Sequence, residues 1–393
     1  MSWAQNSFRY GVDRFIESDY KNFLGKRIGL ITNATGITSE LESTVDALFK
    51  LKAVKLSKLF GPEHGLRGDA HAGQKVEDQT DEQTGLPVFS LYGKTHKPTD
   101  KMLEGLDMLV YDIQDIGNRG YTYIYTMAQA MQAASENQLE FVVLDRPIAL
   151  YGNMVDGNIL DTKFSSFVGM FPIPYIYGMT PGELAQLFNQ EFGIHCKLTV
   201  IPMEGYNHEM DFGNTGRVWI PPSPHIPRYE SAYYCGATGI LGELKTVCEG
   251  VGYTQPFEYV GAPWINSGEL ARELTQRHIP GVYWRPAGFR PFYGKFKDQD
   301  CQGVQLIITD KTKFYPFQIQ LHIFDAIQKL YPNQNFLEIP KDALKKSLFI
   351  KVIGSDQIHT WIIEQKGVDQ IIQSYQAQLD QFKETRKKYL LYP

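Results

Sequence analysis

The chain has 393 residues, of which 43% are hydrophobic and 21% are charged, and its formal net charge is −5. This length is enough for about two domains with sizeable cores. The lack of a basic excess argues against nucleic-acid binding, and no apolar run is long enough to span a membrane. Because the first residues also lack the apolar stretch of a signal peptide, we expect a cytoplasmic protein without membrane contact.

The order of apolar runs and turns predicts the fold of residues 26–150. Strands are predicted at 26–32, 54–59, 87–92, 107–113 and 141–145, and helices at about 39–51, 99–106 and 125–137. Strands that alternate with helices form a parallel sheet with helices on both faces. The N-terminal part is therefore expected to be an α/β domain.

Residues 151–180 are rich in glycine, proline and aromatic residues, and we place a boundary there, with domains at 1–165 and 166–393. In the second domain, Thr180 and Glu183 form a capping box before a helix at 183–192. Residues 239–247 are expected to form a helix and then a strand, and residues 219–227 a proline-stiffened segment. Further strands are predicted at 197–202 and 303–309, and helices at 267–276, 317–330 and 368–389.

The four cysteines, Cys196, Cys235, Cys248 and Cys301, are widely spaced and contain no Cys-x-x-Cys pair. Neither a structural zinc site nor a disulfide framework is expected. The phosphate-binding glycine patterns Gly-x-Gly-x-x-Gly and Gly-x-x-x-x-Gly-Lys-Ser/Thr are also absent. We therefore expect no nucleotide and no other cofactor.

Polar residues follow the predicted strands. Glu63 and His64 lie in the turn Phe-Gly-Pro-Glu-His-Gly-Leu at 60–66, directly after an apolar run. The carboxyl ends of parallel strands meet at one edge of the sheet, where ligands of open α/β folds bind. The side chains expected at this edge are Asn33, Thr35, Glu63, His64, Asp112, Gln114, Asp115, Arg119, Asp145 and Arg146.

Paired carboxylates are the strongest chemical signal in this set. Glycoside hydrolysis needs two of them, one to protonate the leaving oxygen and one to attack the sugar or activate water. The carboxylates that follow apolar runs are Glu63, Asp112, Asp115, Asp145 and Glu249. The alternative is that the aspartates are structural and cap helices or pair with Arg119 and Arg146.

Other chemistries have weaker support. Glu63, His64, Asp69 and His71 are residue types that suit zinc or manganese, but their spacing matches no standard ligand set, so no metal site is predicted. Arginine forks suit an anionic ligand group, although pairing with nearby aspartates is an equal alternative; the candidates are Arg67, Arg119 and Arg146. Aromatic side chains that either stack on a sugar or pack in the core are Tyr121, Tyr123, Trp219 and Trp264.

Eight motifs resemble one family in the same order along nearly the whole chain. They are Phe-Gly-Pro-Glu-His-Gly (60–65), Thr-Gly-Leu-Pro-Val-Phe-Ser-Leu-Tyr-Gly (84–93), Asp-Ile-Gln-Asp-Ile-Gly-Asn-Arg (112–119), Tyr-Thr-Tyr (121–123), Leu-Asp-Arg-Pro (144–147), Gly-Met-Thr-Pro-Gly-Glu-Leu-Ala (178–185), Pro-Phe-Glu (256–258) and Gly-Ala-Pro-Trp (261–264). The chain thereby resembles the NamZ-type exo-β-N-acetylmuramidases of glycoside hydrolase family 171.

This resemblance implies a Rossmann-like N-terminal domain, a smaller α/β C-terminal domain and an active site in the cleft between them. It implies release of terminal N-acetylmuramic acid from the non-reducing ends of peptidoglycan fragments, with Glu63 as the catalytic acid. Combining the motifs with the residue chemistry, we predict a catalytic set of Glu63, His64, Asp112 and Glu249. The predicted substrate-binding set is Asn33, Arg67, Gln114, Asp115, Arg119, Tyr121, Tyr123, Asp145, Arg146 and Trp264.

The chain departs from the family pattern in three short stretches. Val251 stands where the family typically has arginine, and residues 225–228 and 148–152 also differ. Two alternatives to the glycosidase therefore stay open: a muropeptide-binding protein without turnover, and a metal-dependent hydrolase. The oligomeric state is not predicted.

Overall fold

Seven strands form the central sheet of the N-terminal lobe, in the order β3-β4-β2-β1-β5-β6-β9. The computed structural model describes residues 8–63, 65–66, 79–340 and 343–393. All neighbouring strands are parallel except β3 and β4, so the expected parallel α/β architecture is confirmed. The strands are β1 (Arg27–Thr32), β2 (Lys55–Gly61), β3 (Gln79–Thr80), β4 (Pro87–Ser90), β5 (Met108–Asp112), β6 (Glu140–Leu144) and β9 (Lys197–Ile201).

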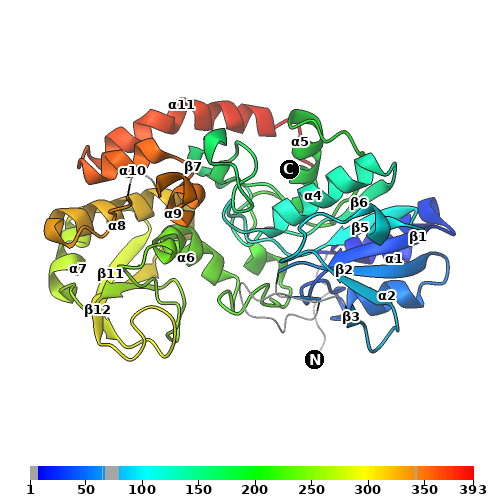
Figure 1. The fold of residues 1–393 in the computed structure, drawn as a ribbon, viewed down its shortest axis with the longest axis horizontal. Helices are drawn as coiled ribbons and strands as arrows, with labels where there is room; N and C mark the ends of the chain where they lie inside the picture. Colours follow the sequence, from blue (N-terminus) through cyan, green and yellow to red (C-terminus); the bar gives the residue numbers. More distant parts are fainter. Residues whose placement is uncertain (1–7, 64, 67–78, 341–342) are drawn as a thin grey trace.

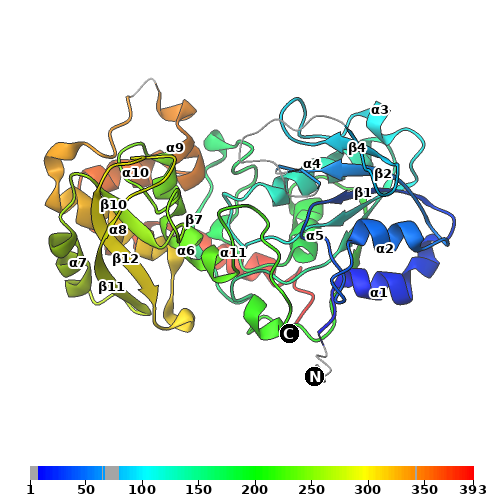
Figure 2. The same cartoon turned by 90° about the horizontal axis from the view of Figure 1, so that it is seen from below.

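Helices cover both faces of this sheet (Figure 2). On one face α1 (Gly11–Glu17) and α2 (Thr44–Lys50) pack on apolar side chains such as Leu30. On the other, α4 (Tyr123–Glu136) and α5 (Pro181–Glu191) pack on the alternate positions, such as Ile31. Successive residues of a strand point to opposite faces, so these fully apolar strands supply two cores at once.

The C-terminal lobe is built on a three-stranded antiparallel sheet, β10-β12-β11. A small hairpin, β7 with β8, lies between the two lobes (Figure 1). The remaining strands are β7 (Asp156–Ile159), β8 (Pro174–Ile176), β10 (Tyr259–Ala262), β11 (Val282–Phe289) and β12 (Cys301–Ile308). The remaining helices are α3 (Asp100–Leu103), α6 (Glu230–Thr238), α7 (Ser267–Gln276), α8 (Pro316–Leu330), α9 (Leu348–Ile353), α10 (Asp356–Ile363) and α11 (Val368–Arg386).

Helix α11 spans both lobes and returns the C-terminus to the first one (Figure 1). It packs on α8 and β7, and Arg386 near its end donates to the carbonyls of Gly152 and Gly178. Beyond it, the Leu391 amide donates to Glu183 and the Tyr392 hydroxyl to Asp145. The last residues of the chain therefore complete the N-terminal lobe.

Two local predictions need correction, and a third is confirmed. Within residues 239–247, only a short 3-10 turn forms, η4 (Gly239–Glu243), and no strand follows it in this described stretch. The helix expected at 39–51 begins only at Thr44, because Leu41 has a left-handed φ of 64° and Ser43 caps the helix. By contrast, the Thr180–Glu183 capping box is confirmed.

The expected boundary between residues 165 and 166 does not coincide with a boundary of the first sheet. Strand β9 hydrogen-bonds to β6, and α5 packs on the same two strands, so residues up to 201 continue the N-terminal lobe. Within the described parts of the chain, the helices are either too short or too polar to cross a lipid bilayer.

Candidate active site

The acidic and basic groups at the ends of β5 and β6 neutralise one another inside the protein. Asp112 is fully buried, and its two carboxylate oxygens accept from the Arg146 guanidinium and, at 2.5 Å, from the Thr44 hydroxyl. Arg146 also donates to the carbonyl of Ile37, and its guanidinium lies 4.6 Å from the centre of the Tyr10 ring. This pair joins strand ends to each other and leaves no open face for a ligand.

Asp145 is enclosed by the helix that it caps. One oxygen accepts from the backbone amide of Gly182 at 2.8 Å, and the other accepts from the hydroxyls of Thr180 and Tyr392. A Cβ at Gly182 would lie 2.8 Å from the Asp145 carboxyl carbon, so only glycine allows this approach. Burial raises the pKa of Asp145 to about 7, against the lowering effect of these hydrogen bonds.

Asp115 is fully buried as well, beside Tyr177, whose hydroxyl donates to it. Burial raises the pKa of Asp115 to about 6. Gln114 donates its side-chain amide to the carbonyls of Asp115 and Pro147, and its backbone amide to Thr35. Asn33 accepts from both the amide and the hydroxyl of Thr35, so these residues form one internal network of the loop ends.

The cavity beside this network is too small for a sugar. It has a volume of about 10 Å³, little more than the space of one water molecule. Residues 218–220 of the proline-rich segment close it over Arg146 and Gln114. The strand edge below this segment is therefore filled by the protein itself.

Arg119 joins the lobes and does not reach an open pocket. Its guanidinium is fully buried and donates to the carbonyls of Asn158, Ile173, Val352 and Ile353, the last two from α9. Burial lowers the pKa of Arg119 to about 10. An arginine with four carbonyl acceptors acts as a fixed connection between domains.

Glu63 lies just beyond the carboxyl end of β2, next to Thr122 and Tyr123. It follows β2 and is only half-buried, and its carboxylate accepts from the Thr122 hydroxyl at 3.2 Å. Burial and then the charge of Glu63 raise the pKa of the neighbouring Tyr92 to about 12. The Tyr123 hydroxyl lies 3.4 Å from the Glu63 carbonyl and donates at 2.5 Å to the carbonyl of Pro222, so one side chain connects the turn to the proline-rich segment.

A pocket of about 250 Å³ opens beside this turn, between the loops of the first lobe and elements of the second. We call it the junction pocket; its lining residues are Asn118, Gly120, Tyr121, Val168, Tyr175, His225, Cys235, Gly239, Gly242, Glu243, Glu249, Val251, Phe257 and Val352. Tyr121 packs edge-on against Tyr123, with ring centres 4.9 Å apart. Tyr123 thus connects Glu63 to the pocket in two ways. Its ring packs on Tyr121, which lines the pocket, and its hydroxyl binds Pro222, in the segment that leads to the lining residue His225.

Two glutamates of the second lobe line the junction pocket. Glu249 is nearly buried and its carboxylate accepts from the Lys295 ammonium at 2.9 Å. Lys295 also donates to the carbonyls of Leu241 and Gly242. Glu243 follows on η4, and burial, with the Glu249 charge added, raises its pKa to about 7, although the Lys295 charge opposes this. The sequence analysis named Glu249 as a candidate, but neither Glu243 nor Lys295.

The remaining expected site residues either lie away from the junction pocket or are not among the described residues. Trp264 follows β10 and packs edge-on against Tyr331, with ring centres 5.5 Å apart, and it is not among the residues that line the junction pocket. His64 and Arg67 lie outside the described residues, as do Asp69 and His71 of the possible metal set. In the described ranges, no three His, Cys, Asp or Glu side chains are grouped to hold a metal ion.

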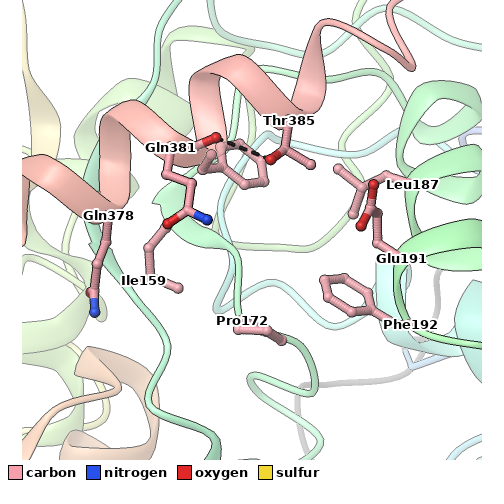
Figure 3. A pocket seen from close by; sticks show the side chains of 9 residues that line it. Ile159, Pro172, Leu187, Glu191, Phe192, Gln378, Gln381 and Thr385 are labelled. Atoms are coloured by element: carbon pink, nitrogen blue, oxygen red, sulfur yellow. Dashed lines mark hydrogen bonds between the residues drawn. The ribbon is translucent and has the colours of Figure 1, made fainter.

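A second hollow, of about 290 Å³, lies between α5 and α11 (Figure 3). Its sides are largely apolar, with Ile159, Pro172, Leu187 and Phe192 pointing into it. Glu191 is its one ionisable lining residue, and this carboxylate accepts from the Tyr389 hydroxyl at 2.6 Å. Glycoside hydrolysis needs two carboxyl groups, and this hollow has one, which is already hydrogen-bonded. The junction pocket, lined by two glutamates, is therefore the better candidate.

Comparisons with known proteins agree with this choice of chemistry. Two family models, described as the N-terminal and C-terminal parts of the exo-beta-N-acetylmuramidase NamZ, match residues 28–230 and 233–392. The peptidoglycan beta-N-acetylmuramidase NamZ of Bacillus subtilis (strain 168) is 48% identical over 382 residues, which are 97% of this chain and 91% of that protein.

Two solved structures, both of DUF1343 family proteins from Bacteroides fragilis NCTC 9343, share the fold. One is 43% identical with a TM-score of 0.93 and covers 99% of this chain and 100% of its own. The other is 30% identical with a TM-score of 0.79, over 98% and 99% of the two chains.

Proposed function

The chain belongs to the NamZ exo-β-N-acetylmuramidase family, and we propose that it hydrolyses the bond between a terminal N-acetylmuramic acid and the rest of a peptidoglycan fragment. The observation that carries this proposal is the junction pocket, which is lined by Glu243 and Glu249 of the second lobe and by Tyr121 of the first. Tyr121 packs on Tyr123, whose hydroxyl reaches the turn that holds Glu63. A pair of carboxyl groups across a sugar-sized pocket is what glycoside hydrolysis requires.

We assign Glu63 as the catalytic carboxyl of the first lobe. It is half-buried, near the pocket, and oriented by the Thr122 hydroxyl. His64, its neighbour in sequence, is proposed to contact the same substrate. Glu249 of the second lobe, paired with Lys295, is proposed to take part in the same reaction.

Most of the other expected site residues are proposed to have a structural role instead of contacting the substrate. Tyr121 lines the pocket and is proposed to contact the sugar directly, while Tyr123 orients the turn. Asp112, Asp145, Arg119 and Arg146 have all of their strong partners inside the protein, so we assign them a structural role instead of substrate contact. Asn33, Gln114 and Asp115 belong to the same internal network.

The substrate is proposed to be a muropeptide or a disaccharide with N-acetylmuramic acid at its non-reducing end. Arg67 remains the proposed partner of the acidic group of that sugar, since arginine forks suit a carboxylate. A cytoplasmic location stays a prediction. The relatives that are named as hydrolases favour turnover over a protein that only binds muropeptides.

The test is hydrolysis of a chromogenic β-N-acetylmuraminide beside the matching N-acetylglucosaminide, by wild type, by wild type with EDTA, and by Glu63→Gln. We expect cleavage of the muraminide only, unchanged by EDTA and lost in the variant. Folded wild-type protein that cleaves neither compound would refute the proposed activity. Activity abolished by EDTA would instead indicate a metal-dependent hydrolase.

A further inference from the structure

Glu243 is the acidic side chain of the junction pocket that has no partner of its own. It lies at the end of η4, and among the described residues no hydrogen bond or ion pair occupies its carboxyl group. Glu249 lines the same pocket, but its carboxylate is already bound by the Lys295 ammonium at 2.9 Å. A ligand in the pocket therefore meets Glu243 as the group with free hydrogen-bonding capacity.

Among the described residues, four carboxyl groups combine burial with a raised pKa, and they differ in what surrounds them. Burial raises the pKa of Asp115 and of Asp156 to about 6, and that of Asp145 to about 7. All three are 0% exposed and accept backbone hydrogen bonds, so protein atoms enclose their protons. Glu243, with a pKa raised by burial to about 7, instead lines a cavity. Of these four carboxyl groups, Glu243 is therefore the one that can pass its proton to a molecule bound in the pocket.

The charged and titratable groups around Glu243 come from several elements. Lys295 and Glu249 carry opposite charges, and both act on the ionisation of Glu243. His225 of the proline-rich segment and Cys235 of α6 line the same pocket. From the first lobe and the β7–β8 hairpin, Tyr121 and Tyr175 complete it, and burial keeps both hydroxyls protonated by raising their pKa.

We propose that Glu243 is the proton donor of the hydrolysis. Glu249 is a positioning residue: it binds Lys295, and Lys295 in turn places its charge near Glu243. This inference rests on the proposed glycosidase function. As the bond between the anomeric carbon and the leaving oxygen breaks, its electron pair goes to that oxygen, which takes the proton of Glu243. The oxygen of a water molecule bonds to the anomeric carbon, and its released proton goes to Glu63.

In this proposal Glu243 takes the role of catalytic acid, which the sequence had suggested for Glu63, and Glu63 becomes the general base. The general acid of a hydrolysis must hold a proton at the working pH, and burial raises the pKa of Glu243, which lines the pocket, to about 7. A donor that is half ionised near pH 7 is also well matched to catalysis at neutral pH.

The experiment compares two substrates that differ in their need for a proton. A 4-nitrophenyl muraminide has a good leaving group. In the disaccharide of N-acetylmuramic acid and N-acetylglucosamine, the leaving N-acetylglucosamine would be a basic alkoxide if no proton were donated to it. Loss of a general acid costs about 10²- to 10⁴-fold. We expect Glu243→Gln to lose that much kcat/KM on the disaccharide and far less on the nitrophenyl compound. Glu338→Gln, at an exposed glutamate of the same lobe, serves as the matched control.

The pH profile supplies the second measurement. For wild type, kcat/KM on the disaccharide should fall as the pH rises through about 7, and this limb should be absent in Glu243→Gln. Equal losses on both substrates, or a disaccharide activity like that of Glu338→Gln, would overturn the assignment of Glu243 and leave the glycosidase function intact. Wild type that cleaves neither substrate would refute the function itself, so the two failures are distinguishable.

Discussion

The strand edge and the junction pocket hold similar numbers of acidic groups but use them in opposite ways. At the strand edge, Asp112 and Asp145 are 0% exposed, and arginine, hydroxyl and amide donors take up their oxygens. At the junction pocket, Glu243 lines the cavity itself, and Glu63, in the turn connected to the pocket through Tyr123, is half-buried. A place at the end of a strand therefore predicts where charged side chains cluster, but a carboxyl group can react only where there is also space for a ligand.

Removal of the carboxyl group of Glu63 is the change with the largest expected effect. The Glu63→Gln variant should lose about 10²- to 10⁴-fold or more in kcat/KM on a muraminide, because a catalytic carboxyl has been replaced by an amide. Its stability should stay near that of wild type, since the side chain is only half-buried. Kinetics and urea unfolding on the same sample separate the two effects; unchanged kinetics would remove Glu63 from the mechanism.

The strand edge should show the reverse pattern. Asp112→Asn leaves the buried Arg146 guanidinium without its anion, and such a loss costs about 3–5 kcal/mol of folding free energy. Adding Arg146→Met removes the unpaired charge and should recover part of this loss. Urea unfolding measures the free energies, and activity per folded molecule should stay close to wild type. A stable but inactive Asp112→Asn protein would contradict the structural role of this aspartate.

The buried Asp145 should make the protein less stable as the pH rises. Its pKa is raised in the folded state to about 7, above the ordinary value near 3.8. Between these two values the unfolded chain loses the proton first, so stability is complete at low pH and falls as the pH rises through about 7. The effect is at most about 4 kcal/mol.

Asp145→Asn keeps the shape of this side chain and should flatten the dependence. Its amide group can donate to the oxygens of Thr180 and Tyr392, which donate to the carboxyl group in the native protein. Chemical unfolding between pH 5 and 8 measures the slope for wild type, Asp145→Asn and the exposed control Asp369→Asn. Equal slopes for all three proteins would mean that Asp145 does not titrate in this range.

The smallest effect is expected at Trp264. Its ring packs on Tyr331 and lies outside the junction pocket, so Trp264→Ala should cost about 1 kcal/mol of stability from the lost aromatic contact. The KM for a muraminide should not change. A large rise in KM would show that this tryptophan contacts the sugar and that the site extends further than the junction pocket.

The architecture of the first lobe was predictable because it depends on local patterns. Alternating apolar runs and helical spacings indicated the parallel sheet, and Thr180 with Glu183 indicated the start of α5. The register of side chains on the sheet follows from the same alternation. The polar turn with Glu63 was also recognisable, because Gly61 and Pro62 end β2 there.

The site itself depends on contacts between distant parts of the chain. Tyr392 lies 247 positions after Asp145, yet its hydroxyl helps to enclose that aspartate. The proline-rich segment closes the strand edge over Arg146, and Lys295 meets Glu249 across 46 positions. Glu243 has no motif around it beyond a preceding glycine, so only its place in the fold reveals it.

The most direct test of this account is a crystal structure of Glu63→Gln with the intact disaccharide of N-acetylmuramic acid and N-acetylglucosamine. We predict that the sugars occupy the junction pocket, with the glycosidic oxygen within hydrogen-bond distance of Glu243 and the anomeric carbon facing residue 63. A disaccharide bound at the strand edge, beside Gln114 and Arg146, would contradict the distinction between the two regions.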